Sequence, residues 1–257
     1  MVIKKRLRQL LQQQDYDEIA DLAAQRHRVL GTLLSLMFDR DPLIGWRAVE
    51  ATGAAAERIA QTDPDVVRDH LRRLHWLISE ESGGICWRAP EALAEIVRRS
   101  PSLFPDYTPI VLYLIREMAE EDLLHFRAGI LWAIGRLGPI CAGPGKGDKS
   151  NLCEAPSGPL RGELDLSPFP GHGRLFDEVL PDVLACLDHP DSQVRGMAAW
   201  CLGQCGRADG LAGRDDLLAD EAPVDLYEGG QLARTSVGRL VRRALAPGSA
   251  EDRPTRE

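Results

Sequence analysis

Two cysteines one helical turn apart are the residues of this chain that come nearest to a metal site. Cys201 and Cys205 lie in a helical, apolar segment, and thiols at this spacing can share a soft metal ion. Cys141, Cys153 and His172 are the other candidate ligands. No two of these thiols have the two-residue spacing typical of zinc knuckles, and Cys201 is equally well explained as a small buried side chain. We therefore expect no bound metal and no cofactor.

A glycine-rich stretch, residues 143–150, superficially resembles a phosphate-binding loop. It lacks an adjacent Gly-Lys-Ser, no strand precedes it, and no helix clearly follows it. The chain also has neither the Gly-x-Ser-x-Gly turn of hydrolases nor the His-Glu-x-x-His helix of zinc proteases. We assign no catalytic residues. Enzymatic activity stays open, because acids and bases distant in sequence can meet in a fold.

A charged and aromatic stretch, residues 80–91, is the best candidate for a binding site. Its double glycine permits a tight turn, and Trp87 beside Arg88 has the composition of an interface hot spot. A second combination of tryptophan and arginine follows in the next helical segment. We predict that exposed parts of these segments contact a protein partner through Glu81, Trp87, Glu91, Trp132 and Arg136.

The charge balance limits the classes of partner. The 257 residues include 39 acidic and 31 basic ones, and a formal net charge of −8 poorly suits a surface that tracks phosphates. We expect no nucleic acid as a partner. No run of about eighteen apolar residues is present, and the basic start is not followed by the apolar stretch of a secretory signal. We therefore expect a cytoplasmic monomer with reduced thiols and no membrane contact.

An internal repeat defines the elements that must position these residues. Four segments share an apolar residue, an arginine and a small residue, and a further small residue follows six positions after each arginine. The arginines are 41, 39 and 68 residues apart, and the first two intervals match the period of HEAT or armadillo units. The repeat also offers a purely structural explanation of Trp87 and Arg88. The repeat arginines are Arg47, Arg88, Arg127 and Arg195, and the small residues are Gly53, Ala94, Ala133 and Cys201.

Each arginine segment follows a separate amphipathic segment, so the repeating unit is helix, turn, helix. Apolar residues at spacings of three and four lie on one helical face, and Asp-Pro pairs mark two of the turns. One pair cannot bury its apolar faces alone, so neighbouring pairs must stack. The predicted fold is all-α, a right-handed α-solenoid. The predicted pairs are 27–38 with 42–60, 64–80 with 85–99, 105–119 with 122–137, and 176–187 with 191–205.

The remaining segments complete one predicted domain over residues 1–247. A Gly-Gly turn between two short apolar segments predicts a β-hairpin, and an amphipathic stretch after it predicts a last helix. The predicted parts are N-terminal capping helices (1–26), repeats one to three (27–137), a flexible Gly/Pro-rich insertion (138–175), repeat four (176–220), a hairpin and helix cap (221–247) and a disordered tail (248–257).

The four arginine helices resemble HEAT repeats of the short bacterial type grouped with phycobilin lyase subunits. The stretches 81–91 and 126–136 are also similar to uncharacterised HEAT-repeat proteins of anaerobic, sulfate-reducing bacteria. The resemblance implies that an acid of the turn meets the repeat arginine, forming a ladder along the stack. The implied pairs are Asp41 with Arg47, Glu81 with Arg88, Glu121 with Arg127, and Asp191 with Arg195.

These observations favour a non-catalytic scaffold or assembly adaptor that binds a protein on its concave surface, formed by the second helix of each pair. The resemblance implies one alternative, an accessory enzyme or cofactor chaperone of the phycobilin-lyase-like type. A HEAT-like DNA glycosylase is a third possibility, which the acidic composition disfavours.

Overall fold

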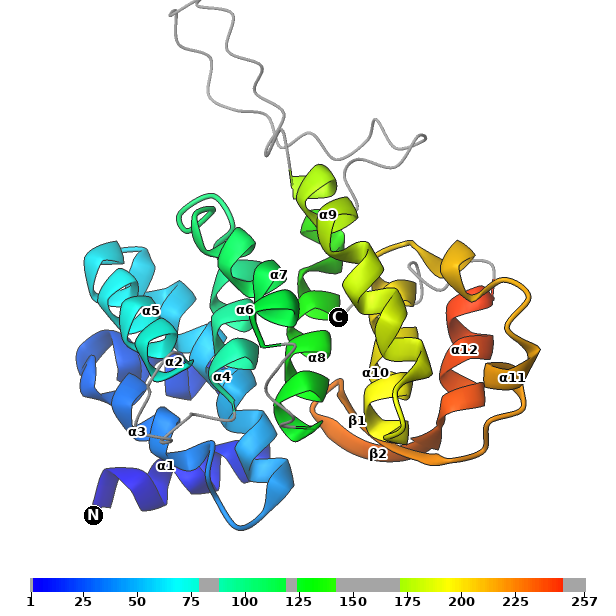
Figure 1. The fold of residues 1–257 in the computed structure, drawn as a ribbon. Helices are drawn as coiled ribbons and strands as arrows, with labels where there is room; N and C mark the ends of the chain where they lie inside the picture. The colour runs from blue at the N-terminus through cyan, green and yellow to red at the C-terminus, as the bar shows by residue number, and fades with distance from the viewer. Residues whose placement is uncertain (1, 79–87, 119–123, 142–171, 247–257) are drawn as a thin grey trace, which may run out of the picture.

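The computed structural model describes residues 2–78, 88–118, 124–141 and 172–246, which form a stack of helix pairs with one short hairpin (Figure 1). This architecture confirms the predicted α-solenoid with a C-terminal hairpin and helix. The helices are α1 (Val2–Gln13), α2 (Tyr16–Gln25), α3 (Arg28–Leu36), α4 (Pro42–Ala60), α5 (Pro64–Ile78), α6 (Ala89–Arg99), α7 (Tyr107–Glu117), α8 (Leu124–Cys141), α9 (His172–Ala185), α10 (Ser192–Gln204), α11 (Asp215–Leu218) and α12 (Val237–Leu245). The 3-10 turns are η1 (Cys186–Asp188) and η2 (Ala208–Leu211), and the strands are β1 (Pro223–Glu228) and β2 (Gln231–Ser236).

Aspartates begin several of these helices, as the turn residues predict. The Asp41 carboxylate accepts the N–H of Leu43 at 3.0 Å, and Pro42 follows as the first helical residue. Asp191 caps α10 in the same way, accepting the N–H of Gln193 at 2.8 Å. Such caps satisfy N–H groups that have no partner inside the helix. They fix where the second helix of a pair starts.

Each odd-numbered helix packs against the even-numbered helix that follows it, and the even-numbered helices pack on one another from α2 to α12. We call the surface of this closely packed layer the inner face. Small residues allow the close approach: a Cβ atom on Gly53 would lie 2.9 Å from the carbonyl oxygen of Glu95. Ala94, Ala133 and Cys201 are fully buried. The small residues of the repeat therefore serve the helix stack, as predicted.

The hairpin turns at two glycines between β1 and β2. Gly229 and Gly230 have φ values of +58° and +75°, which glycine adopts without steric cost and which suit a two-residue hairpin turn. The register pairs Glu228 with Gln231 next to the turn and Val224 with Thr235 near the strand ends. The hairpin lies between α11 and α12 in the chain, and α12 packs on α10 as the next even-numbered helix.

Several boundaries differ from those predicted. Helix α8 continues through Gly138 to Cys141, and α9 already begins at His172, so both ends of the predicted insertion 138–175 are helical. Residues 142–171 lie outside the described part of the chain. The short helix α11 and the turn η2 were not predicted. Within the described ranges, no helix combines the length and apolar character needed to cross a membrane.

Candidate interaction surface

The hairpin crosses the inner face and joins the two ends of the stack. The ring of Tyr227 in β1 stacks on Trp46 of α4, with centroids 5.1 Å apart and planes 4° from parallel. Its hydroxyl donates to Glu50 at 2.7 Å, and its carbonyl oxygen accepts the indole N–H of Trp132 at 2.9 Å. The hairpin therefore does more than cap the fourth repeat, because it reaches the first.

Arg47 of the first repeat fixes the hairpin turn. Its guanidinium donates to the carbonyl oxygen of Gly230 at 3.0 Å and to those of Leu11 and Gln12 at 3.1 and 2.9 Å. Because Arg47 is buried, these carbonyls replace water as its hydrogen-bond partners. The end of α1, the first repeat and the C-terminal hairpin are thus joined by a single side chain.

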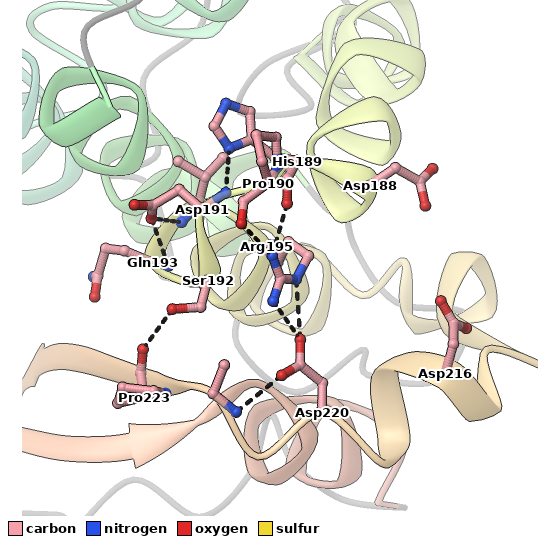
Figure 2. Close-up of polar contacts among 12 residues, drawn as sticks. Asp188, His189, Pro190, Asp191, Ser192, Gln193, Arg195, Asp216, Asp220 and Pro223 are labelled. Atoms are coloured by element: carbon pink, nitrogen blue, oxygen red, sulfur yellow. Dashed lines mark hydrogen bonds and ion pairs between the residues drawn. The ribbon is translucent and has the colours of Figure 1, made fainter.

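Side chains of α10 fix the other end of β1 (Figure 2). The Ser192 hydroxyl donates to the carbonyl oxygen of Pro223 at 2.8 Å. The amide of Gln193 accepts the N–H of Asp225 at 2.8 Å and donates to its carbonyl oxygen at 2.7 Å. A glutamine side chain thus occupies the place that a neighbouring strand would take along this edge of β1.

Arg195 of α10 fixes the segment that leads into the hairpin (Figure 2). Its guanidinium pairs with Asp220 at 2.7 Å and donates to the carbonyl oxygens of His189 and Pro190, both at 2.8 Å. Asp220 in turn accepts the N–H of Ala222 at 2.9 Å. The fourth repeat arginine therefore positions the start of β1 indirectly.

The predicted ladder of turn acids and arginines is wrong at Arg47 and Arg195. Asp41 and Asp191 cap their own helices. Arg47 and Arg195 bind main-chain carbonyls near helix ends, and the acid that pairs with Arg195 is Asp220. Arg127 does the same, since it donates to the carbonyl oxygen of Met118 at 3.4 Å. Helix C-termini leave carbonyls unpaired and carry partial negative charge, so they attract guanidinium groups. The acids predicted for Arg88 and Arg127, Glu81 and Glu121, lie outside the described residues.

Three of the five predicted contact residues lie in the described part of the chain, on α6 and α8, but two of them are not exposed. Glu91 and Trp132 are each 1% exposed, so the expectation that they face solvent is wrong. The Arg136 side chain is 21% exposed and lies 5.3 Å from the Trp132 ring centroid. Glu81 and Trp87 lie outside the described residues.

Stacked rings and guanidinium groups form one cluster under and beside the hairpin. Trp132 lies 4.8 Å from Trp46, and the Arg88 guanidinium lies 3.8 Å from the Trp46 centroid. Cations over tryptophan faces are attracted by the ring quadrupole. The sequence signalled Trp132 and Arg136 but not Trp46 or Tyr227 as members. We call these five residues the inner-face cluster: Trp46, Arg88, Trp132, Arg136 and Tyr227.

Two glutamates one turn apart on α6 are buried in contrasting surroundings. Burial opposes the charge of Glu95, but Arg136 and Arg98, at 2.5 and 2.8 Å, lower its pKa to about 2. Burial raises the pKa of Glu91 to about 7, and Arg88 at 3.4 Å only partly offsets it. One Glu91 oxygen has no hydrogen-bond partner among the described residues. The two carboxyls therefore differ in charge near neutral pH.

The two arginines of the inner-face cluster, and Arg98 beside them, are partly exposed, whereas their acidic partners are buried. The side chains of Arg88, Arg98 and Arg136 are 22%, 25% and 21% exposed, whereas Glu91 and Glu95 are buried below them. Arginine beside aromatic rings suits recognition of carboxylate and aromatic groups on another protein. The arrangement is suited to binding.

A second feature is an open hollow of about 500 Å³ between the α9–α10 turn and α11. Its charged groups satisfy one another, since Arg214 pairs with Asp188 at 2.7 Å and with Asp216 at 2.9 Å. In the described part of the chain, no cluster of three or more possible metal ligands is found. Cys186, Cys201 and Cys205 are free and buried, and burial raises the pKa of the Cys186 thiol to about 11.

Comparison with known protein families agrees with the helical repeat. The HEAT repeat family matches residues 179–208, which include the second half of α9 and all of α10. This match and the helix pairs of the structure support a HEAT-like repeat protein. An uncharacterised protein of Archaeoglobus fulgidus is 28% identical over 108 residues, 42% of this chain and 53% of that protein. This match thus spans about half the length of the relative. The crystal structure of the archaeal HEAT-like repeats protein from Thermococcus onnurineus NA1 aligns over 95% of this chain and 98% of its own, with 14% identity and a TM-score of 0.32.

Proposed function

We propose that this protein is an interaction scaffold and that its protein partner binds the inner face, at the hairpin and the arginines beside it. The inner-face cluster carries the proposal, because partly exposed guanidinium groups lie over rings that the hairpin holds in place. Arginine, tryptophan and tyrosine are the residues most enriched in interface hot spots. Stacks of HEAT-like pairs also offer long surfaces for such contacts.

The surface is organised before any partner arrives. Arg47, Trp132 and Gln193 hold the hairpin at its turn, middle and start. A preformed surface lowers the entropy lost on binding. The partner therefore meets the hairpin together with the even-numbered helices, rather than an open groove between helices.

The charge of the surface selects the chemistry of the partner. Three partly exposed guanidinium groups over buried carboxylates favour a protein segment that carries Asp or Glu. The net charge of the whole chain disfavours nucleic acid. We place the encounter in the cytoplasm, which suits the free thiols of the described cysteines. No observation favours the alternative of a cofactor chaperone.

Site-specific photocrosslinking tests the proposal. A photoreactive benzoylphenylalanine is placed at Ala233 on the hairpin or, as a matched control, at Arg72 on α5 of the outer layer; both positions are exposed. After illumination in a lysate of the source cells, crosslinked proteins are identified by mass spectrometry. We expect one defined protein to crosslink at 233 and not at 72. Equal labelling at both positions, or labelling at 72 alone, would contradict an inner-face site.

A further inference from the structure

The two edges of the hairpin differ in how their backbone groups are used. In an antiparallel pair, alternate residues exchange hydrogen bonds, and the residues between them point outward. In a hairpin with a two-residue turn, the flanking pair Glu228 and Gln231 is hydrogen-bonded, and pairs two residues apart follow the same pattern. The backbone N–H and C=O groups of Tyr227 and Asp225 therefore point out of the β1 edge. Those of Leu232 and Arg234 point out of the β2 edge.

Side chains of the helices occupy the β1 edge. Gln193 pairs with both backbone groups of Asp225, and Trp132 donates to the carbonyl oxygen of Tyr227 at 2.9 Å. Ser192 donates to the carbonyl oxygen of Pro223 at the end of the strand. Another strand cannot pair here without displacing these contacts. This edge is closed.

The β2 edge is open. No hydrogen bond joins the outward N–H and C=O groups of Leu232 and Arg234 to any other described residue. The side chains of Gln231, Ala233 and Arg234 are exposed, so solvent reaches this strand. Four unpaired main-chain groups on a rigid strand form a template for one more strand.

The charge around this edge is positive. Arg234 projects from β2 itself. Arg239, in the first turn of α12, helps to lower the pKa of Glu221 through its positive charge. The Glu221 carboxylate accepts the Ser236 hydroxyl at the end of β2. Arg242 pairs with the same carboxylate at 3.2 Å. Arg239 and Arg242 thus lie near one acid, and Arg234 lies opposite Asp225 in the register of the hairpin. These three arginines outnumber the two acids, so an incoming strand that carries carboxylates is favoured.

We propose that the open edge of β2 binds an extended acidic segment of a protein partner, which adds to the hairpin as a third strand. This inference rests on the proposed function and specifies how part of the partner binds. The competing explanation is that Arg234 is a charged residue that keeps a short edge strand from pairing at all. The two explanations predict opposite results when an extended peptide is supplied.

The first test uses the capped peptide acetyl-Thr-Glu-Val-Glu-Val-Glu-Thr-amide and the full-length protein, observed by amide NMR. Without peptide, the N–H groups of Leu232 and Arg234 should exchange quickly, because they have no acceptor, whereas that of Ala233 is protected by β1. With peptide up to millimolar concentration, Leu232 and Arg234 should become protected, and Ala233 should stay as it was. Unchanged exchange at Leu232 and Arg234 would overturn the proposal.

Two variants at one position separate backbone pairing from charge. Arg234→Pro removes an N–H that pairs with nothing inside the protein, so the hairpin should still form. Arg234→Ala removes the charge and keeps the N–H. We expect peptide affinity to fall by about tenfold or more for Arg234→Pro and by less for Arg234→Ala. Equal affinities for the two variants would overturn the added strand, provided that their melting temperatures agree.

The photocrosslink distinguishes failure of this inference from failure of the proposed function. If the crosslink from position 233 persists and Arg234→Pro retains full partner binding, the partner uses the inner face without adding a strand. If position 233 gives no crosslink at all, the proposed function itself is wrong. A crosslink from 233 together with loss of binding in Arg234→Pro supports both.

Discussion

Tyr227 and Trp46 stack face to face, although one lies in the hairpin of β1 and β2 and the other near the start of α4, the second helix of the first repeat. This contact closes the stack across its inner face. It makes the hairpin part of the folded unit and part of the surface that a partner meets. Substitutions of Tyr227 measure how much this contact contributes to the free energy of unfolding.

Removing the Tyr227 ring should cost far more than removing its hydroxyl. Tyr227→Ala leaves a cavity between Trp46 and Trp132 and should lower the free energy of unfolding by about 3–5 kcal/mol. Tyr227→Phe keeps the ring and loses the hydroxyl contacts with Glu50 and, at 3.4 Å, with Tyr16. Glu50 still accepts from Tyr16 at 3.0 Å, so about 1 kcal/mol is expected. Urea unfolding measures both. Similar values for the two variants would show that the stack contributes little.

Glu91→Gln should change the pH dependence of stability. The folded pKa of about 7 lies above the ordinary value of 4.5, so the folded state holds more protons between these pH values, and stability falls as pH rises. The loss is about 3 kcal/mol at most, at about 1.4 kcal/mol per pKa unit. Glu91→Gln cannot lose this proton, so its stability relative to wild type should increase from pH 5 to pH 8.

Glu95→Gln is the matched control one turn along α6. The folded pKa of about 2 lies below the ordinary value, so its stabilisation is complete above about pH 4.5 and is lost as pH falls toward 2. Between pH 5 and pH 8 the variant should be less stable than wild type by a constant amount, about 3–5 kcal/mol, because Arg98 and Arg136 lose a buried partner. Chemical denaturation at several pH values tests both variants. Parallel pH profiles for Glu91→Gln and wild type would refute the unusual state of Glu91.

Arg47 should contribute strongly to the free energy of unfolding, whereas the exposed Arg72 should not. Arg47→Ala leaves three carbonyl oxygens without their donor and should cost about 3 kcal/mol or more. Arg47→Lys should restore only part of this, because one ammonium lacks the fork that reaches all three. Arg72→Ala, at an exposed ion pair on α5, should stay within about 0.5 kcal/mol of wild type. A tolerated Arg47→Ala would mean that the hairpin turn is fixed by other contacts.

Two glycines in helices should respond in opposite directions to alanine. A Cβ on Gly53 would lie 2.9 Å from the main-chain oxygen of Glu95, so Gly53→Ala must push α4 and α6 apart and should destabilise by about 1–3 kcal/mol. Gly31 in α3 has nothing within 4 Å, and Gly31→Ala should stabilise by about 0.5–1 kcal/mol through helix propensity. Thermal melts of the two variants test the close packing of the inner layer. If both substitutions stabilise the protein, α4 and α6 are not packed closely enough to exclude a methyl group at position 53.

The helix pairs could be predicted because their signals are local. Asp41 with Pro42 marks one joint, Asp191 marks another, and a repeated arginine links the units. The place of the hairpin in the sequence could be predicted, but its packing across the first repeat could not, because no local pattern joins Tyr227 to Trp46. Glu91 follows a proline in the first turn of a helix, where acids are usually exposed, and only the packing of α6 against α8 buries it.

Hydrogen–deuterium exchange tests the central claim most directly. The exchange of the protein is measured alone and in complex with the purified partner that photocrosslinking has identified. If the partner binds the inner face, peptides covering 223–236 and 88–99 should exchange more slowly in the complex, and α5 on the outer layer should be unchanged. Slower exchange confined to α5 and the other odd-numbered helices, with the hairpin unaffected, would contradict the claim.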